Sequence, residues 1–164
     1  RLSYSFDDLM CRAELAARAS WTDIPAKSGI YVVQWLLRNE PRFRDDTGNV
    51  EYRIAADPDW LRAKWQRINA RSATDIIYIG KGTDLRKRVR QLTRFGVGKT
   101  RTHRGGEWMW QITEIRRAQL MVQVCPQGRE VAFENWLLER FDLDHGEIPL
   151  ANRSGPKGYE RWHP

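Results

Sequence analysis

The alternation of apolar and polar positions is clearest in the middle of the chain. An apolar run rich in β-branched residues, Ile76 to Ile79, is typical of a strand and ends at a Gly-Lys-Gly sequence, residues 80–82. A basic helical pattern follows, with Thr83 as the expected N-cap, Asp84 in the first turn and no Gly or Pro before Gly96. The pattern predicts a strand, a tight glycine-containing exit and a helix.

The predicted helix has two distinct faces. At about 100° of rotation per residue, Leu85, Val89 and Leu92 form a narrow apolar stripe, which predicts the buried face. Arg88 lies at the edge of this stripe, so packing would hold its guanidinium beside the strand end, where a fixed cation can meet a phosphate. The other cations lie on the far side, and their pattern fits a solvated face as well as phosphate contact: Arg86, Lys87, Arg90 and Arg94.

Similar patterns predict the other elements. Helical spacing of apolar residues follows a capping-box-like start at Ser5, and alternating apolar residues typical of strands flank the central segment. Gly128 precedes the last clear helical pattern. The predictions are a helix over 6–19, a strand over 29–35, a short helix over 107–113, a strand over 119–124 and a helix over 130–141.

Residues 38–74 form an apparent insertion between the first two strands. The insertion combines a turn at 45–49, a short alternating run at 50–54 and a helix that starts at Asp57 and Pro58. Its helix places Trp60, Leu61, Trp65 and Ile68 on one side, which fits a helix that covers the sheet edge, or alternatively an arm that reaches along DNA. Residues 1–164 are expected to form a single domain. The Gly-, Pro- and basic-rich residues 149–164 are expected to lie over it as an extended segment, with 154–164 as the C-terminal tail.

Charge narrows the range of partners. The chain of 164 residues has 28 Lys and Arg against 21 Asp and Glu, for a net charge of +7, and the basic residues cluster between Lys81 and Arg104. Such a patch indicates a polyanion, most often nucleic acid. No apolar run is long enough to cross a membrane and no signal peptide is visible, so we expect a soluble, cytoplasmic protein. The two Cys and three His lack metal-ligand spacing.

The last helix carries an unusual carboxylate. Its apolar residues, taken as Phe133, Leu137, Leu138 and Phe141, predict a buried stripe that contains Glu134. A buried carboxylate requires a cation, a hydrogen-bond donor or a metal beside it. The structural alternative to a metal is a salt bridge to an arginine of the central helix.

The sequence resembles the GIY-YIG nuclease superfamily. Both name-giving tripeptides are present in order, and residues that match the other motif positions of the family follow them. The match covers residues 28–153 and is carried by Gly29, Ile30, Tyr31, Tyr78, Ile79, Gly80, Lys81, Arg88, Ala132, Glu134 and Asn152.

The resemblance implies an α+β fold with a small three-stranded antiparallel sheet flanked by helices, here with an added N-terminal helix and the insertion. It implies a metal-dependent DNA endonuclease in which Glu134 binds one divalent cation, Mg²⁺ or Mn²⁺. By the same resemblance the catalytic group is Tyr31, Tyr78, Lys81, Arg88 and a helper, His103. The substrate-binding group is expected to be Arg86, Lys87, Arg90, Arg104 and Asn152.

In the resulting hypothesis Tyr31 activates or orients the attacking water, which requires Lys81 or the metal to lower the pKa of the phenol. Arg88 stabilises charge on the phosphate. The sequence departs from the family pattern at three places. Residues 32–77 form a far longer spacer than the usual one, Leu92 stands where many members carry Tyr or His, and the gap from Glu134 to Asn152 is longer than expected.

Two other functions fit the same residues. A nuclease-like domain could grip DNA or RNA without cutting it, and a toxin-type RNase would differ only in substrate. The basic patch fits all of these equally. The sequence also leaves open whether the chain acts alone, as a homodimer or as part of a larger protein.

Overall fold

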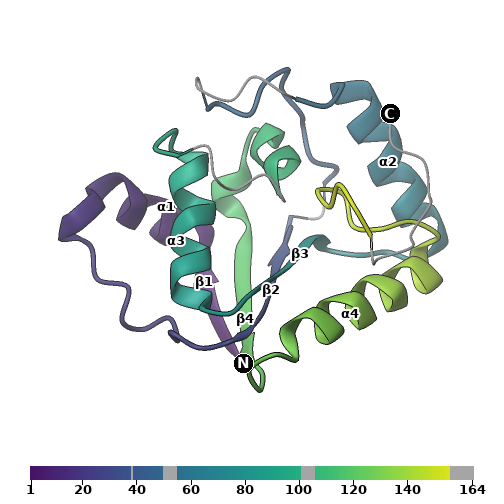
Figure 1. Ribbon diagram of the computed structural model, residues 1–164. Coiled ribbons are helices and arrows are strands. Elements are labelled where there is room, and N and C mark those ends of the chain that lie inside the picture. Colours follow the sequence, from purple (N-terminus) through teal and green to yellow (C-terminus); the bar gives the residue numbers. More distant parts are fainter. Residues whose placement is uncertain (38, 50–54, 101–105, 156–164) are drawn as a thin grey trace.

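A computed structural model describes residues 1–37, 39–49, 55–100 and 106–155, and it contains a four-stranded open sheet (Figure 1). The strands are β1 (Leu2–Ser5), β2 (Gly29–Gln34), β3 (Ile76–Gly82) and β4 (Gln119–Val124). Their order is β1-β4-β2-β3 and all neighbours are antiparallel. The α+β class is therefore confirmed.

The prediction of three strands is wrong, because β1 adds a fourth. Leu2 pairs with Val122 and Tyr4 with Leu120, which places β1 on the outer edge of β4. The strand has only four residues and is largely exposed. It is too short for an alternating pattern, and Ser5 looked like the start of the following helix.

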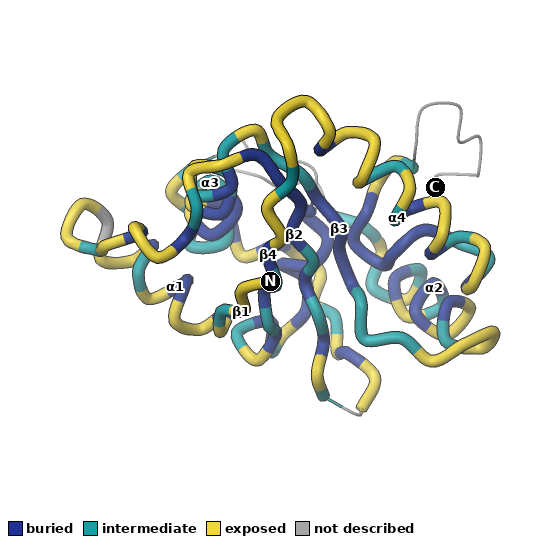
Figure 2. The backbone as a smooth tube through the Cα atoms, turned by 90° about the horizontal axis from the view of Figure 1, so that it is seen from below, coloured by how far each residue is buried: buried dark blue, intermediate teal, exposed yellow. Residues whose placement is uncertain are grey.

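Within the described ranges, four α-helices flank the strands. In both views α1 and α3 lie on one side of the sheet, and α2 and α4 lie on the other (Figures 1 and 2). Most predicted helices are present, but their ends are shifted. The last helix ends at His145, four residues later than the predicted end at 141, and Gly146 follows it with φ 76°. The bounds are α1 Phe6–Leu15, α2 Pro58–Arg71, α3 Leu85–Gly96 and α4 Glu130–His145, with short 3-10 turns at Ala16–Arg18, Glu107–Gln111 and Ile115–Arg117.

The start of α3 differs from the prediction by one residue. Asp84, not Thr83, is the N-cap, since its side chain accepts a hydrogen bond from the backbone N–H of Lys87 (2.9 Å). The predicted apolar stripe is confirmed: Leu85, Val89 and Leu92 are completely buried. The stripe fixes the rotation of α3 and hence the direction of its charged face.

The helix of the insertion is part of the core. Leu61, Trp65 and Ile68 are buried, as expected for a covering helix, and Trp60 is half-buried. The same face also buries Lys64, whose charge the apolar pattern did not anticipate. The short alternating run predicted at 50–54 lies outside the described residues.

The free edge of β3 is closed by a turn near the end of the described chain. Ala151 donates a backbone hydrogen bond to Ile77 O (2.8 Å). Asn152 accepts one from Ile79 N (3.0 Å) at Oδ1 and donates one to Ile79 O (2.8 Å) from Nδ2. Lys64 Nζ donates to the carbonyls of Pro149 (3.1 Å) and Asn152 (3.4 Å). Residues 149–152 are therefore a buried turn and not the start of an extended tail; residues 156–164 of the predicted tail lie outside the described chain.

Among the described residues, no helix combines the length and the apolar character that crossing a bilayer requires.

Candidate active site

A cleft runs between α3, the end of β3 and α4. It consists of two adjoining hollows of about 520 and 440 Å³. The residues common to both hollows, and hence at the centre of the cleft, are Tyr78, Lys81, Arg88, Val131 and Glu134. Four of these five are residues that the sequence predicted for the active site, although they come from three separate elements.

Lys81 and Glu134 form an ion pair across the cleft, between Nζ and Oε2. The carboxylate is the less accessible partner, since the Glu134 side chain is 15% exposed and the Lys81 side chain 36%. The predicted need for a partner is met, but among the described residues that partner is not an arginine of α3, which was the structural alternative to a metal. The partner comes from the β3 exit instead.

The face of α4 that carries Glu134 was predicted around the wrong residue. Leu138, Phe141 and His145 are buried, whereas Phe133 is 40% exposed and Trp136 59% exposed. Apolar side chains occur on all faces of α4, so the periodicity of apolar residues could not identify which face is buried. Glu134 lies on the true inner face, because it is separated from Leu138 by one turn.

Arg88 projects into the cleft beside the glycine-rich exit of β3. A Cβ at Gly82 would lie only 3.0 Å from the Cβ of Arg88, so the absence of a side chain at position 82 allows this close approach. The guanidinium makes one long hydrogen bond, from Nη1 to Oε1 of Gln91 (3.5 Å). No salt bridge to Arg88 occurs within the described part of the chain, which leaves its donors available for an anion.

The two motif tyrosines lie together below the cleft. Tyr31 is completely buried, Tyr78 is 3% exposed, and their ring centroids are 5.8 Å apart. Gly80 makes room for this arrangement, since a Cβ there would lie 2.5 Å from Cζ of Tyr31. Tyr78 lines the cleft, and the buried hydroxyl of Tyr31 lies close to Tyr78 and to the Arg88 guanidinium.

Burial raises the pKa of both phenols above the ordinary tyrosine value, although the nearby Arg88 guanidinium opposes this shift. The pKa of Tyr78 is raised furthest, because the neighbouring Tyr31 adds to the effect of burial. In the protein alone, burial outweighs the neighbouring guanidinium, so the lowering of the Tyr31 pKa that the hypothesis assigned to Lys81 is not found; the part assigned to the metal stays a prediction. Both phenols remain protonated at neutral pH.

A second carboxylate, Glu130, also lines the cleft one turn before Glu134. Ser28 donates a hydrogen bond from Oγ to its Oε2 (2.6 Å). That bond, with backbone donors and the charge of Lys81, lowers the pKa of Glu130. Glu130 was not among the predicted site residues, although its spacing of one helical turn from Glu134 was an available signal.

The predicted substrate-binding residues separate into two groups. Lys87 and Asn152 line the cleft, but the amide of Asn152 is already bonded to Ile79. Arg86 and Arg90 lie on the α1 side of α3: Arg86 donates to the carbonyls of Ile24 (2.8 Å) and Thr22 (3.1 Å), and the Arg90 guanidinium lies over Trp21.

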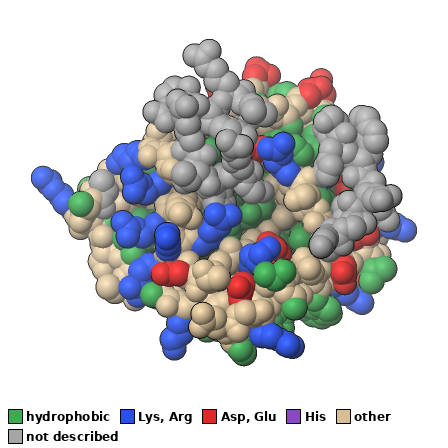
Figure 3. Space-filling view, in the orientation of Figure 1, with side chains coloured by type: hydrophobic (Ala, Val, Ile, Leu, Met, Phe, Trp, Pro, Cys, Tyr) green, Lys and Arg blue, Asp and Glu red, His purple; other side chains and the backbone are tan. Residues whose placement is uncertain are grey.

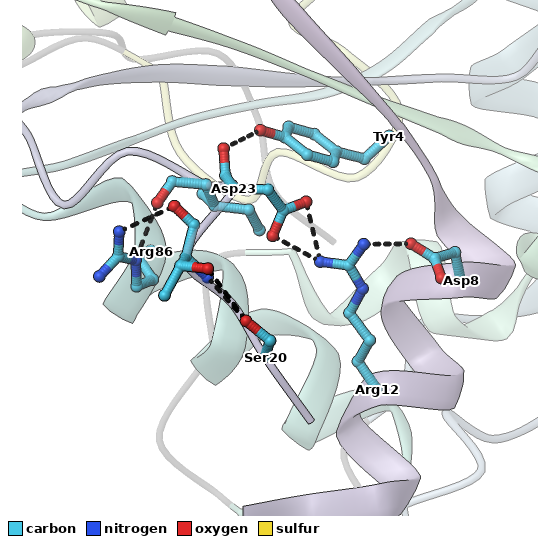
Figure 4. A network of polar contacts seen from close by, with 8 residues as sticks. Tyr4, Asp8, Arg12, Ser20, Asp23 and Arg86 are labelled. Atoms are coloured by element: carbon cyan, nitrogen blue, oxygen red, sulfur yellow. Dashed lines mark hydrogen bonds and ion pairs between the residues drawn. The ribbon is translucent and has the colours of Figure 1, made fainter. Parts of the chain in front are cut away.

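Figure 4 shows Arg86 beside a network in which Arg12 joins Asp8 and Asp23. This network holds residues 20–24 against α1 and α3. Arg86 therefore has a structural role, which its position on the helix face did not reveal. The predicted residues His103 and Arg104 lie outside the described chain.

The surface over α3 is rich in positive charge. Lys and Arg side chains gather over this part of the molecule in the space-filling view (Figure 3). Arg94 and Lys87 are exposed there, and Arg88 marks the side that faces the cleft. A polyanion that follows this surface would therefore reach the centre of the cleft.

The donor set of the cleft fits a hard divalent cation held by few protein ligands. Within the described ranges, no group of three or more His, Cys, Asp or Glu is arranged to hold a metal ion. Glu134 supplies one carboxylate and Glu130 a second one nearby. Mg²⁺ commonly binds through one or two carboxylates and completes its shell with water and substrate phosphate. The site fits that pattern and does not fit a closed structural metal centre.

Comparisons with known proteins give no family: no family model matches the sequence, and no curated protein or solved structure matches it.

Proposed function

We propose that this chain is a metal-dependent endonuclease that hydrolyses DNA phosphodiester bonds, with a site of the GIY-YIG type. The observation that carries the proposal is the cleft itself. Lys81 and Arg88 line it together with a shielded carboxylate, Glu134, and with Tyr78, one of a buried pair of tyrosines. An arginine without an acidic partner among the described residues and a carboxylate that can bind a hard metal suit phosphoryl chemistry when they share one cleft.

Each residue has a distinct part in this proposal. Arg88, whose guanidinium has no acidic partner among the described residues, would bind the scissile phosphate and stabilise its growing negative charge. Glu134 would hold the divalent cation, which supplies Lewis-acid stabilisation of the phosphate and of the leaving 3′ oxygen. Lys81 would contact the same phosphate once it is released from Glu134.

The tyrosines would orient groups by hydrogen bonding. Burial keeps both phenols protonated, so each can donate as well as accept. Tyr78 borders the cleft and would contact substrate or water directly. Tyr31 would support Tyr78 from below, and it could act as a base only if bound positive charge overcame the effect of burial on its pKa.

A cleavage assay on supercoiled plasmid tests the proposal. Wild type should nick or linearise the plasmid with Mg²⁺ or Mn²⁺ but not with EDTA. Glu134→Gln should remove cleavage and retain a gel shift. Glu139→Gln is the matched control, since it changes the same residue type on the exposed face of the same helix. Cleavage by Glu134→Gln at the wild-type rate would refute the assignment.

One observation favours a second candidate, a nucleic-acid-binding domain that does not cut. Lys81 already neutralises Glu134, so burial of the carboxylate does not by itself require a metal. A plasmid that shifts on a gel but stays intact under every metal condition would support this candidate. Parallel incubation with single-stranded RNA and a DNA of the same sequence would identify an RNase.

A further inference from the structure

The centre of the cleft contains a positive charge of the protein at the place where a metal ion would bind. The Lys81 ammonium is paired with Oε2 of Glu134. Glu130, one turn away on α4, lines the same hollow. Its side chain is flexible and 36% exposed, so it can move without disturbing the core.

A divalent cation would compete with this ammonium for Glu134. Lys81 is paired with Oε2, one of the two carboxylate oxygens that a metal could use. Two positive charges held at one partly shielded carboxylate would also repel each other strongly. Metal binding at Oε2 therefore requires Lys81 to leave, and metal binding at Oε1 is opposed by its charge.

Within the described residues, the other acids of this hollow are Glu130 and Asp84, and both already hold other groups. Glu130 accepts a hydrogen bond from Ser28, and Asp84 accepts one from the backbone of Lys87 at the start of α3. The remaining charged neighbours in this hollow are cations, Lys87 and Arg88. An incoming phosphate would provide the missing anion, because its oxygens can accept from Lys81 and Arg88 at once.

We propose that the Lys81 ammonium competes with the metal for Glu134. A divalent cation displaces this ammonium effectively only when a phosphate group enters the cleft and accepts hydrogen bonds from the released Lys81. This inference rests on the proposed function, because that function identifies the cleft as the site that binds metal and phosphate. It makes metal and phosphate binding mutually dependent, and by thermodynamic linkage each ligand raises the affinity for the other by the same factor.

Mn²⁺ affinity tests this competition without any cleavage step. Free Mn²⁺ is measured by electron paramagnetic resonance for wild type, Lys81→Met, Lys81→Gln and Lys87→Met, with and without thymidine 3′,5′-bisphosphate. That compound supplies phosphate chemistry without a cleavable diester. Lys87→Met is the matched control, since it removes the same charge from the same cleft but not from Glu134.

The expected result is specific to position 81. Without the bisphosphate, both Lys81 variants should bind Mn²⁺ at least about tenfold more tightly than wild type, and Lys87→Met should stay within about threefold. The bisphosphate should tighten Mn²⁺ binding at least about tenfold in wild type and much less in the Lys81 variants.

Three results would overturn the inference: equal Mn²⁺ affinity in wild type and both Lys81 variants, an equal gain in Lys87→Met, or no Mn²⁺ binding by any variant. Failure of the proposed function is distinguishable. If the position-81 effect is present but the plasmid is never cut, the competition is real and the nuclease proposal fails.

Discussion

The buried lysine of α2 leads to a quantitative prediction about stability and pH. Lys64 is 2% exposed, and burial lowers its pKa from 10.5 to about 8. Below pH 8 the residue is charged in both the folded and the unfolded state, so the folded state carries the full desolvation cost. Between pH 8 and 10.5 the folded protein loses this proton first, and the free energy of unfolding should rise with pH.

The size of the effect follows from the pKa difference. Each pKa unit corresponds to about 1.4 kcal/mol, so the total gain is on the order of 3 kcal/mol, of which about 2 kcal/mol should appear between pH 7 and 9.5. Urea unfolding followed by tryptophan fluorescence at several pH values measures this gain. Other titrating groups contribute as well, so the comparison protein is Lys64→Met, which retains them all.

Lys64→Met removes the desolvation cost but leaves the carbonyls of Pro149 and Asn152 without their donor. At pH 7 its free energy of unfolding therefore depends on two opposing contributions of about 1–3 kcal/mol each: the gain from removing a buried charge and the loss from leaving two carbonyls without a donor. The pH slope is the decisive quantity. If wild type and Lys64→Met give parallel curves from pH 7 to 9.5, the pKa shift of Lys64 is not what the structure implies.

Three further predictions concern the site. Asn152→Ala removes both side-chain hydrogen bonds to Ile79 and should lower the free energy of unfolding by about 2 kcal/mol in urea unfolding; a loss below about 0.5 kcal/mol would contradict the role of Asn152. Arg88→Ala should lower the cleavage rate at least about 100-fold. Arg90 lies on the other side of α3, so Arg90→Ala should mainly weaken DNA binding in a salt-dependent way. Equal cleavage rates for the two variants would contradict the placement of Arg88 in the cleft and of Arg90 outside it. The ionisation of each phenol can be measured from the difference in absorbance at 295 nm between wild type and Tyr31→Phe or Tyr78→Phe. Both phenols should ionise above pH 10 while the protein stays folded. Ionisation near neutral pH would restore the hypothesis that a tyrosine acts as the base.

The sequence predicted the elements whose residues carry a strong local pattern. The stripe of Leu85, Val89 and Leu92 gave the correct buried face of α3, because charged residues occupy the rest of that helix. On α4 the same reasoning chose Phe133 wrongly, because apolar residues occur on all sides. Local periodicity identifies a face only when the opposite face is polar.

The parts that could not be predicted depend on contacts between distant segments. Lys81 and Glu134 are 53 positions apart, and no local pattern links them. Lys64 meets the carbonyl of Asn152 across 88 positions, so its burial follows from the docking of a later segment. The raised pKa values of the tyrosines likewise depend on how tightly the assembled core encloses them.

The closing of β3 by residues 151–152 also bears on how the chain folds. During synthesis β3 is complete long before Asn152, which lies 73 positions after Ile79, has left the ribosome. Until the turn at 149–152 docks, β3 presents an open edge that can pair with the same edge of another nascent chain. Docking of this turn therefore protects the edge of β3 from aggregation. It also links α2 to β3, because Lys64 of α2 donates hydrogen bonds to the same turn.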